Sequence, residues 1–92
     1  MIAIDWSQTI TTEMKAAAEA AERLSRAQQQ QAALRQVADN AIEPLQDAVD
    51  LGMATPEESA MLLAWKRYRV ELSRVPTQAG YPDEITWPAP PA

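Results

Sequence analysis

The stretch at residues 52–58 reads Gly-Met-Ala-Thr-Pro-Glu-Glu and predicts where one helix ends and the next begins. Gly52 fits the left-handed position just after a helix, because glycine adopts a positive φ without a steric penalty. Thr55 is a good N-cap, Pro56 suits the first helical position, and Glu58 completes a capping box. Since the stop and the start lie only a few residues apart, the two helices are predicted to turn back on each other.

The chain before this turn predicts one long helix that starts at Thr12 with Thr11 as its N-cap. Residues 14–41 contain no glycine or proline and are rich in strong helix formers. A heptad-like seam of small and apolar residues recurs at spacings of three and four: Leu24, Ala27, Gln31, Leu34, Ala38, Ala41, Leu45 and Ala48. Pro44 interrupts this pattern, because an interior proline removes a backbone hydrogen bond and clashes with the preceding turn. Two outcomes stay open: the helix kinks near Asn40, or it ends and a second helix begins with Pro44 in its first turn.

The chain after the turn predicts a second helix from Pro56 to about Arg74. One broad apolar face repeats at spacings of three and four: Met61, Trp65, Tyr68, Leu72 and Val75. Five prolines then forbid helix, so residues 76–92 are predicted to form an extended, Pro-rich tail. The side chains that could anchor this tail are Tyr81, Ile85 and Trp87.

The N-terminus has a different pattern, because residues 2–10 alternate apolar and polar side chains as a short strand does. A lone strand is not stable and would have to pair with another segment or chain. The predicted fold is therefore mainly α. It has an extended or strand-like arm at 1–11, a helical hairpin domain at 12–75, in which the second helix runs antiparallel to the long first one, and the tail at 76–92.

The composition argues against enzyme chemistry. The 92 residues include no cysteine and no histidine, which removes thiolate metal sites, the commonest general base and the commonest transition-metal ligand. No nucleophile–base pairing, glycine-rich phosphate loop or metal-ligand spacing is present, so we expect no catalytic residue, no cofactor and no metal.

The charge and hydropathy also limit the partners. The net charge of −5 argues against binding to a phosphate backbone. No run approaches about 18 apolar residues, and the N-terminus has no positive region before an apolar one, so neither a membrane span nor a signal peptide is predicted. We expect a soluble, cytoplasmic protein without nucleic-acid or membrane partners.

A protein partner is the expected source of further burial, since a chain this short buries only about 60% of its unfolded surface. The candidate partner-binding residues are Trp65, Arg67, Tyr68, Arg69, Leu72 and Trp87. Aromatic and arginine side chains are enriched in binding hot spots, although Trp65 and Tyr68 also suit a core.

Two charged sets lie on the two predicted helices. The acidic set is Asp39, Glu43, Asp47 and Asp50, and the basic set is Lys66, Arg67, Arg69 and Arg74. In an antiparallel hairpin these sets either face each other or form two solvated faces, and one of them could grip a partner.

Three blocks of the sequence resemble the C-terminal part of bacteriophage tail fibre assembly proteins. They are residues 42–55 (IEPLQDAVDLGMAT), residues 63–75 (LAWKRYRVELSRV) and residues 85–88 (ITWP). The resemblance implies a chaperone that binds the distal part of a trimeric phage tail fibre and assists its folding and trimerisation. It places the protein in the host cytoplasm during assembly and, for members that stay on the fibre tip, in the virion.

The resemblance also implies a difference in length, since family members usually carry an N-terminal β-rich portion that is reduced here to residues 2–10. An alternative function is a small structural coiled-coil or adaptor protein of the phage tail, either as a homo-oligomer or in complex with the trimeric fibre. A nucleic-acid-binding regulator, based on the basic cluster around Tyr68, is a third and weaker hypothesis.

Overall fold

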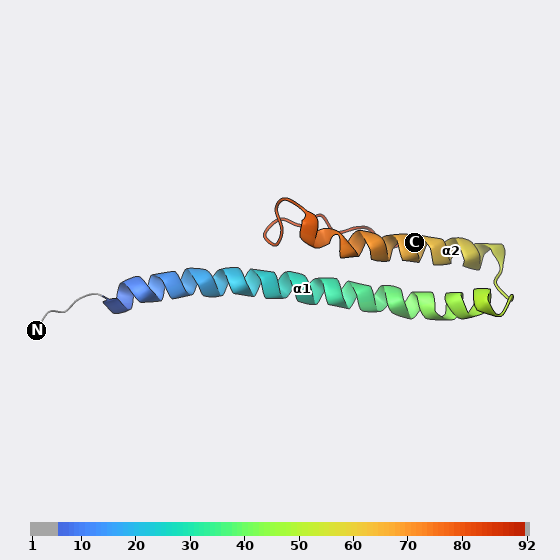
Figure 1. Ribbon diagram of the computed structural model, residues 1–92, viewed down its shortest axis with the longest axis horizontal. Coiled ribbons are helices and arrows are strands. Elements are labelled where there is room, and N and C mark those ends of the chain that lie inside the picture. The colour runs from blue at the N-terminus through green and yellow to red at the C-terminus, as the bar shows by residue number, and fades with distance from the viewer. Residues whose placement is uncertain (1–5, 92) are drawn as a thin grey trace, which may run out of the picture.

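The computed structural model describes residues 6–91 and consists of two α-helices and one 3₁₀ helix, α1 (Trp6–Asp50), α2 (Pro56–Ser73) and η1 (Val75–Thr77). Helix α2 lies antiparallel beside the C-terminal half of α1, and the N-terminal half of α1 continues beyond it as a single rod (Figure 1). The molecule is accordingly long and thin, with extents of 80 × 21 × 17 Å. The prediction of a mainly helical chain built on an antiparallel hairpin is confirmed.

Helix α1 begins earlier than the sequence predicted, at Trp6 instead of Thr12. The strand predicted over residues 2–10 is therefore wrong for residues 6–10, and residues 1–5 lie outside the described part of the chain. The physical reason is that an existing helix is extended at little free-energy cost, whereas a strand needs a partner to pair with. Nothing opposes this extension, because residues 6–13 contain neither glycine nor proline.

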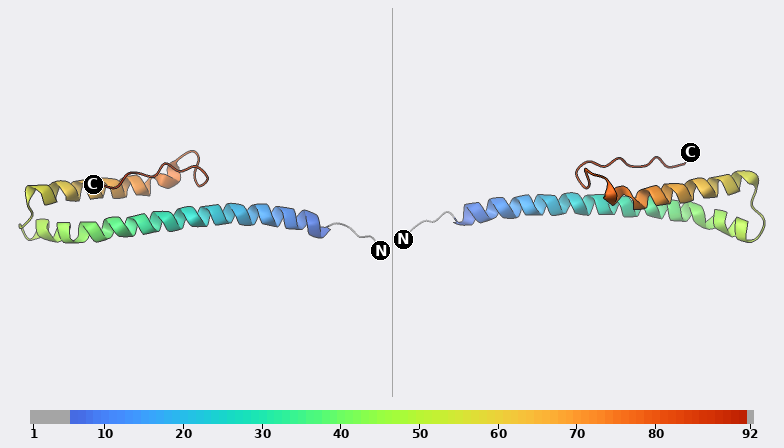
Figure 2. Two further views of the ribbon diagram at one scale, coloured as in Figure 1. Left: turned by 180° about the vertical axis from the view of Figure 1, so that it is seen from behind. Right: turned by 45° about the horizontal axis from the view of Figure 1, so that its top comes forward.

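Helix α1 also runs through Pro44 as one 45-residue element, so a separate second helix beginning at Pro44 is excluded. Pro44 and Asn40 are both exposed. The carbonyl that loses its hydrogen bond to the proline therefore lies on the side where water can reach it, which reduces the penalty. Figures 1 and 2 show α1 as a gently curved rod.

The end of α1 is closed by a Schellman motif, as the sequence predicted. Gly52 has a φ of 69°. The Met53 amide donates to the Ala48 carbonyl at 2.7 Å, and the Gly52 amide donates to the Val49 carbonyl at 3.0 Å. These bonds use carbonyl groups that the helix end would otherwise leave unpaired.

The start of α2 is fixed by the predicted capping box. The Glu58 amide donates to the Thr55 hydroxyl at 3.1 Å, and the Thr55 amide donates to the Glu58 carboxylate at 2.9 Å. Both ends of the connection between the helices are thus defined by local backbone bonds.

The core lies along the inner side of the hairpin, and the buried apolar residues among those whose burial is described are Ala27, Ala38, Ile42, Leu62, Tyr68, Leu72 and Val75. Its centre is Ala38 with Tyr68 and Leu72, and Leu34, Trp65 and Trp87 pack around them. The seam predicted on α1 is this inward face, because it supplies both buried alanines. Small side chains at this face leave room for the large side chains of α2.

The tail is folded rather than simply extended. Residues 75–84 form η1 and a series of turns, and only residues 85–91 lack regular secondary structure. The tail runs back beside α2 (Figure 2). The Gln78 side chain holds it in shape, since it donates to the Thr86 carbonyl and accepts from the Thr86 amide, both at 2.8 Å. The predicted anchoring role of Trp87 is confirmed by its place beside the core.

Candidate partner-binding surface

Four of the six residues predicted to bind a partner lie together in one aromatic and apolar cluster. Tyr68 and Leu72 are 3% and 1% exposed and belong to the interior of the hairpin. Trp65 meets Tyr68 edge to face, with ring centroids 5.7 Å apart and ring planes at 87°. Trp87 reaches the same cluster from the tail, and both tryptophans are half-buried. A partner can therefore touch Trp65 and Trp87, whereas Tyr68 and Leu72 act by supporting them.

Burial also affects the chemistry of this cluster. It raises the pKa of the Tyr68 phenol above its ordinary value of 10.0, because the charged phenolate would lose its hydration. The phenol is therefore neutral at physiological pH and behaves as part of the apolar core.

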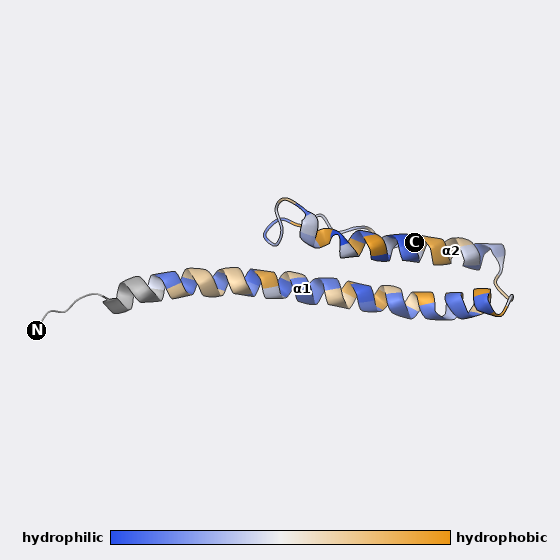
Figure 3. Cartoon of the chain, viewed as in Figure 1, coloured by the Kyte–Doolittle hydropathy of each residue, from blue (hydrophilic) through white to orange (hydrophobic). Residues whose placement is uncertain are grey.

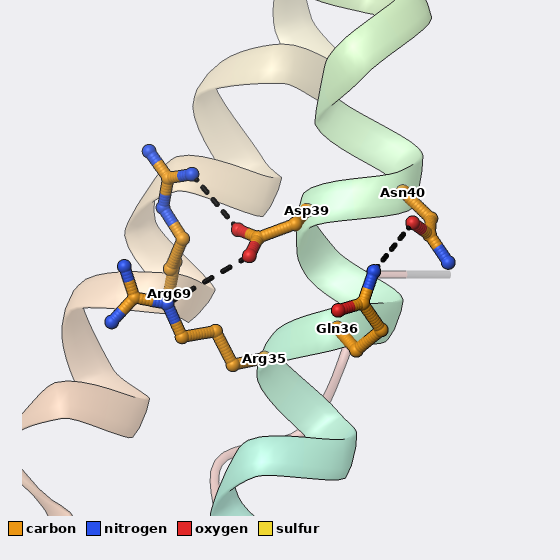
Figure 4. A network of polar contacts seen from close by, with 5 residues as sticks. All are labelled: Arg35, Gln36, Asp39, Asn40 and Arg69. Carbon is orange, nitrogen blue, oxygen red and sulfur yellow. Dashed lines mark hydrogen bonds and ion pairs between the residues drawn. The ribbon is translucent and has the colours of Figure 1, made fainter.

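The remaining two residues of the predicted set are separate from the cluster. Arg67 is exposed on α2. Arg69 donates to Asp39 of α1 at 3.0 Å, and Arg35 approaches the same carboxylate at 3.8 Å (Figure 4). Of the two arrangements left open for the acidic and basic sets, Asp39 and Arg69 adopt the one in which they face each other. Because these side chains are more than a third exposed, the contacts orient α2 on α1 more than they stabilise it.

A further contact joins the helices through Gln31, a residue of the predicted seam whose bonding partner the sequence did not indicate. The Gln31 side-chain amide donates to the Leu72 carbonyl at 2.8 Å in a half-buried setting. This carbonyl lies in the last turn of α2, where the regular hydrogen bonds of the helix end. The pairing depends on how far α2 extends along α1, which spacing along the sequence does not reveal.

Trp87 also lines a shallow pocket between α1 and the tail. The pocket has a volume of about 340 Å³, and its lining residues are Arg23, Arg26, Ala27, Gln30, Pro82, Asp83, Ile85 and Trp87. Arg23 and Asp83 form an ion pair of 2.6 Å across one side of it. Both charges are exposed, so the pair fixes the position of the tail without enclosing the pocket.

A second group of accessible side chains lies at the turn between the helices. Leu51 and Met53 are each 72% exposed, the highest fraction among the exposed large apolar residues of the described chain. Exposed acidic residues Asp47, Asp50 and Glu57 lie beside them in the sequence. In Figure 3 the last turns of α1 beside the connection are mostly hydrophilic, with small apolar patches among them. We call these five residues the turn surface.

The turn end of the molecule carries the negative charge of the whole chain. Between Arg35 and Lys66 the sequence has six acidic residues and no basic one: Asp39, Glu43, Asp47, Asp50, Glu57 and Glu58. The rest of the chain has seven acidic and eight basic residues and is almost neutral. The turn surface was not among the predicted binding residues, although this long interval without lysine or arginine is visible in the sequence.

Residues 12–22 of α1 have no covering element among residues 6–91, whereas Arg23 and Ala27 already meet the tail. Every side chain from residue 12 to residue 26 is exposed, including Met14 at 64% and Leu24 at 38%.

Among residues 6–91, neither α1 nor α2 has the length and hydropathy that a membrane-spanning helix needs. Within the same residues, no three acidic side chains are grouped so that they could hold a metal ion.

Comparison with known proteins identifies one family. A family model described as "Caudovirales tail fibre assembly protein, lambda gpK" matches residues 3–92. The tail fiber assembly protein of Escherichia phage lambda is 52% identical over 69 residues, which are 75% of this chain and 34% of that protein. The prophage tail fiber assembly protein homolog TfaR of Escherichia coli (strain K12) is 49% identical over 69 residues, which are 75% of this chain and 35% of that protein.

A third relative, tail fiber assembly protein U of Escherichia phage Mu, is 50% identical over 56 residues, which are 61% of this chain and 32% of that protein. The chain thus spans about a third of the length of the curated relatives that it matches. The names of these relatives describe assembly proteins and no enzyme. No solved structure matches the chain.

Proposed function

Because the chain belongs to the Caudovirales tail fibre assembly protein family, we propose that it is a chaperone for a phage tail fibre. In this role it binds the distal part of the trimeric fibre and assists its folding and trimerisation in the host cytoplasm. Retention at the fibre tip in the virion is compatible with this role but not required by it. The observation that carries the proposal is the family match over residues 3–92, which includes the whole hairpin and its tail.

The surfaces of the hairpin support a binding role. A fibre chain that has not yet trimerised exposes apolar surface, and a helical hairpin with accessible apolar side chains can cover such surface. The chain offers Trp65 and Trp87 on one side and Leu51 and Met53 at the turn. Arg67 is exposed and can add a charged contact at the edge of such an interface.

Coexpression tests the chaperone function. The tail fibre protein of the same phage or prophage is produced with this chain, without it, and with the variant Leu72→Asp, and soluble trimer is measured by light scattering after purification. Leu72 is 1% exposed, so a carboxylate there should unfold the hairpin. We expect soluble trimer only with the unchanged chain. A fibre that trimerises equally well in all three cultures would disprove the proposal.

A second candidate function is a structural adaptor of the phage tail, and the uncovered N-terminal part of α1 favours it. A long exposed helix can be built into a larger helical assembly of the virion. This function requires a fixed number of copies in purified particles, which quantitative mass spectrometry measures. Particles that lack the chain and still carry trimeric fibres would reject the adaptor and leave the chaperone.

A further inference from the structure

We infer that the turn surface is the part of this chain that seats in the fibre, in an apolar pocket bordered by lysine or arginine side chains. This inference rests on the proposed function and specifies which end of the molecule makes the contact. It starts from Leu51 and Met53, the most exposed large apolar side chains of the described residues.

The two side chains are held outward by a well-defined backbone. The Schellman motif at Gly52 and the capping box at Thr55 lie on either side of Met53, so the connection between the helices has its hydrogen bonds made within the chain. In a Schellman motif the residue after the glycine often packs onto the helix that it ends. Met53 is instead 72% exposed. Because the backbone is already ordered, only side-chain freedom is lost when Leu51 and Met53 enter a pocket.

The charge around these side chains specifies the partner. Asp47, Asp50 and Glu57 are exposed, and no basic residue occurs between Arg35 and Lys66. The positive charge opposite this surface must therefore come from the partner. A pocket with an apolar floor and a basic border fits both features.

The same charges argue against a second copy of this chain as the occupant. Two turn surfaces brought together would place acidic residues against acidic residues. The other parts of a second copy offer few bases, since four of the eight in the chain already pair with its own acidic residues: Arg23, Arg26, Arg35 and Arg69. A nucleic acid and an anionic membrane would be repelled for the same reason.

Paired substitutions test the apolar contact. The purified fibre protein is immobilised, and the dissociation constant is measured for the unchanged chain, for Leu51→Ala with Met53→Ala, and for the matched control Leu63→Ala with Val70→Ala. The control pair is also apolar and exposed, at 64% and 46%, but lies on α2. We expect the dissociation constant to rise about tenfold or more for the turn pair and to change less than about twofold for the control pair.

Charge reversal tests the electrostatic contact independently of the apolar one. Asp50→Lys should weaken binding at low salt and reduce its salt dependence, whereas Glu71→Lys, the same charge change at an exposed site on α2, should leave both unchanged. Thermal melts of all variants establish that each is folded. If the variant Leu51→Ala with Met53→Ala proves unfolded, the binding of Asp50→Lys decides whether the turn surface contacts the fibre.

The outcomes separate this inference from the proposed function. If the unchanged chain does not bind the fibre, the proposed function fails. If it binds and the turn variants bind equally well, the inference fails and the proposed function stands. If the turn pair changes the sedimentation of the chain alone, the surface contacts a second copy and the inference is overturned.

Discussion

Gly52 and Gly80 are both turn residues, but each is required for a different physical reason. Gly52 has a φ of 69°, and a Cβ built on it would meet no heavy atom within 4 Å. At Gly80 a Cβ would lie 2.7 Å from the Cβ of Glu84 and 2.9 Å from its carbonyl oxygen. The first glycine is needed for its backbone conformation and the second for the space it leaves.

Substitutions should separate these two requirements. Gly52→Ala should lower the free energy of unfolding by about 1 kcal/mol, because the left-handed conformation disfavours a Cβ, and Gly52→Asn should lower it less. At Gly80 both alanine and asparagine should be destabilising, since either adds the same clashing atom. Urea unfolding at neutral pH measures all four variants. Equal losses for alanine and asparagine at position 52 would contradict the conformational explanation.

The buried phenol of Tyr68 predicts a loss of stability in alkali. Its pKa in the folded chain is raised above 10.0, the ordinary value that the unfolded chain should have. Below about pH 10 the phenol is protonated in both states and stability is unaffected. As the pH rises from there through the raised folded value, the unfolded state loses its proton first and the free energy of unfolding falls.

The variant Tyr68→Phe tests this prediction, because it removes the titrating group and keeps the ring. As the pH rises above 10, the free energy of unfolding of the variant should fall less steeply than that of the unchanged chain. Chemical denaturation at a series of pH values gives the two slopes. Identical slopes would show that Tyr68 is not responsible for the alkaline loss.

At the scale of the helices, Pro44 is a residue that α1 contains at a cost in stability. It lies inside a continuous 45-residue helix and is exposed. Pro44→Ala should therefore raise the free energy of unfolding by up to about 3 kcal/mol, because alanine restores a backbone donor and removes the clash of the ring. The melting temperature should rise accordingly. A neutral effect would contradict the expectation that Pro44 costs the helix free energy.

The same scale shows which elements could be predicted from the sequence. The turn was predicted correctly because Gly52, Thr55 and Glu58 act through bonds to residues at most a few positions away. The strand at residues 2–10 was wrong for its last five residues, since alternation over nine residues is a weak signal beside the tendency of an adjoining helix to extend. The core seam was visible because helical spacing alone places Ala27 and Ala38 on one face.

The docking of the tail could not be predicted in the same way. Trp87 was predicted to anchor the tail, but the cluster that it packs against combines Ala38 of α1 with Tyr68 and Leu72 of α2, and their meeting depends on how the two helices align. The ion pair of Arg23 with Asp83 spans 60 positions in the sequence. Contacts of this range follow from the packed structure. The sequence therefore could not show that Trp87 joins Trp65, Tyr68 and Leu72 in one cluster while Arg67 and Arg69 lie apart from it.

At the scale of the whole molecule, the chain is far from globular. Its radius of gyration is 21.2 Å, whereas a compact domain of this length would have about 12 Å. The difference arises because α2 and the tail cover only part of α1 (Figure 1). Stability therefore resides in the hairpin, and the N-terminal half of α1 depends on it.

Deletion of residues 1–20 tests this division. Residues 6–20 are a third of α1, and the side chains described there are exposed. The far-UV helical signal per molecule should fall, while the melting temperature should change by less than about 4 °C, since little buried surface is lost. A larger decrease, or a melting temperature that depends on protein concentration only in the full chain, would show that these residues pack against something.

The continuity of α1 also fixes an angular relation between its two halves. Each residue of an α-helix advances by about 1.5 Å and rotates by about 100°. The exposed face of the N-terminal half of α1 therefore has a fixed angular position relative to the face of α1 that packs against α2. A single residue inserted between the halves would swing one against the other by about 100°, whereas seven would bring them back to within about 20° of alignment. The relative orientation of the two halves of α1 therefore depends on the number of residues between them more than on which residues these are.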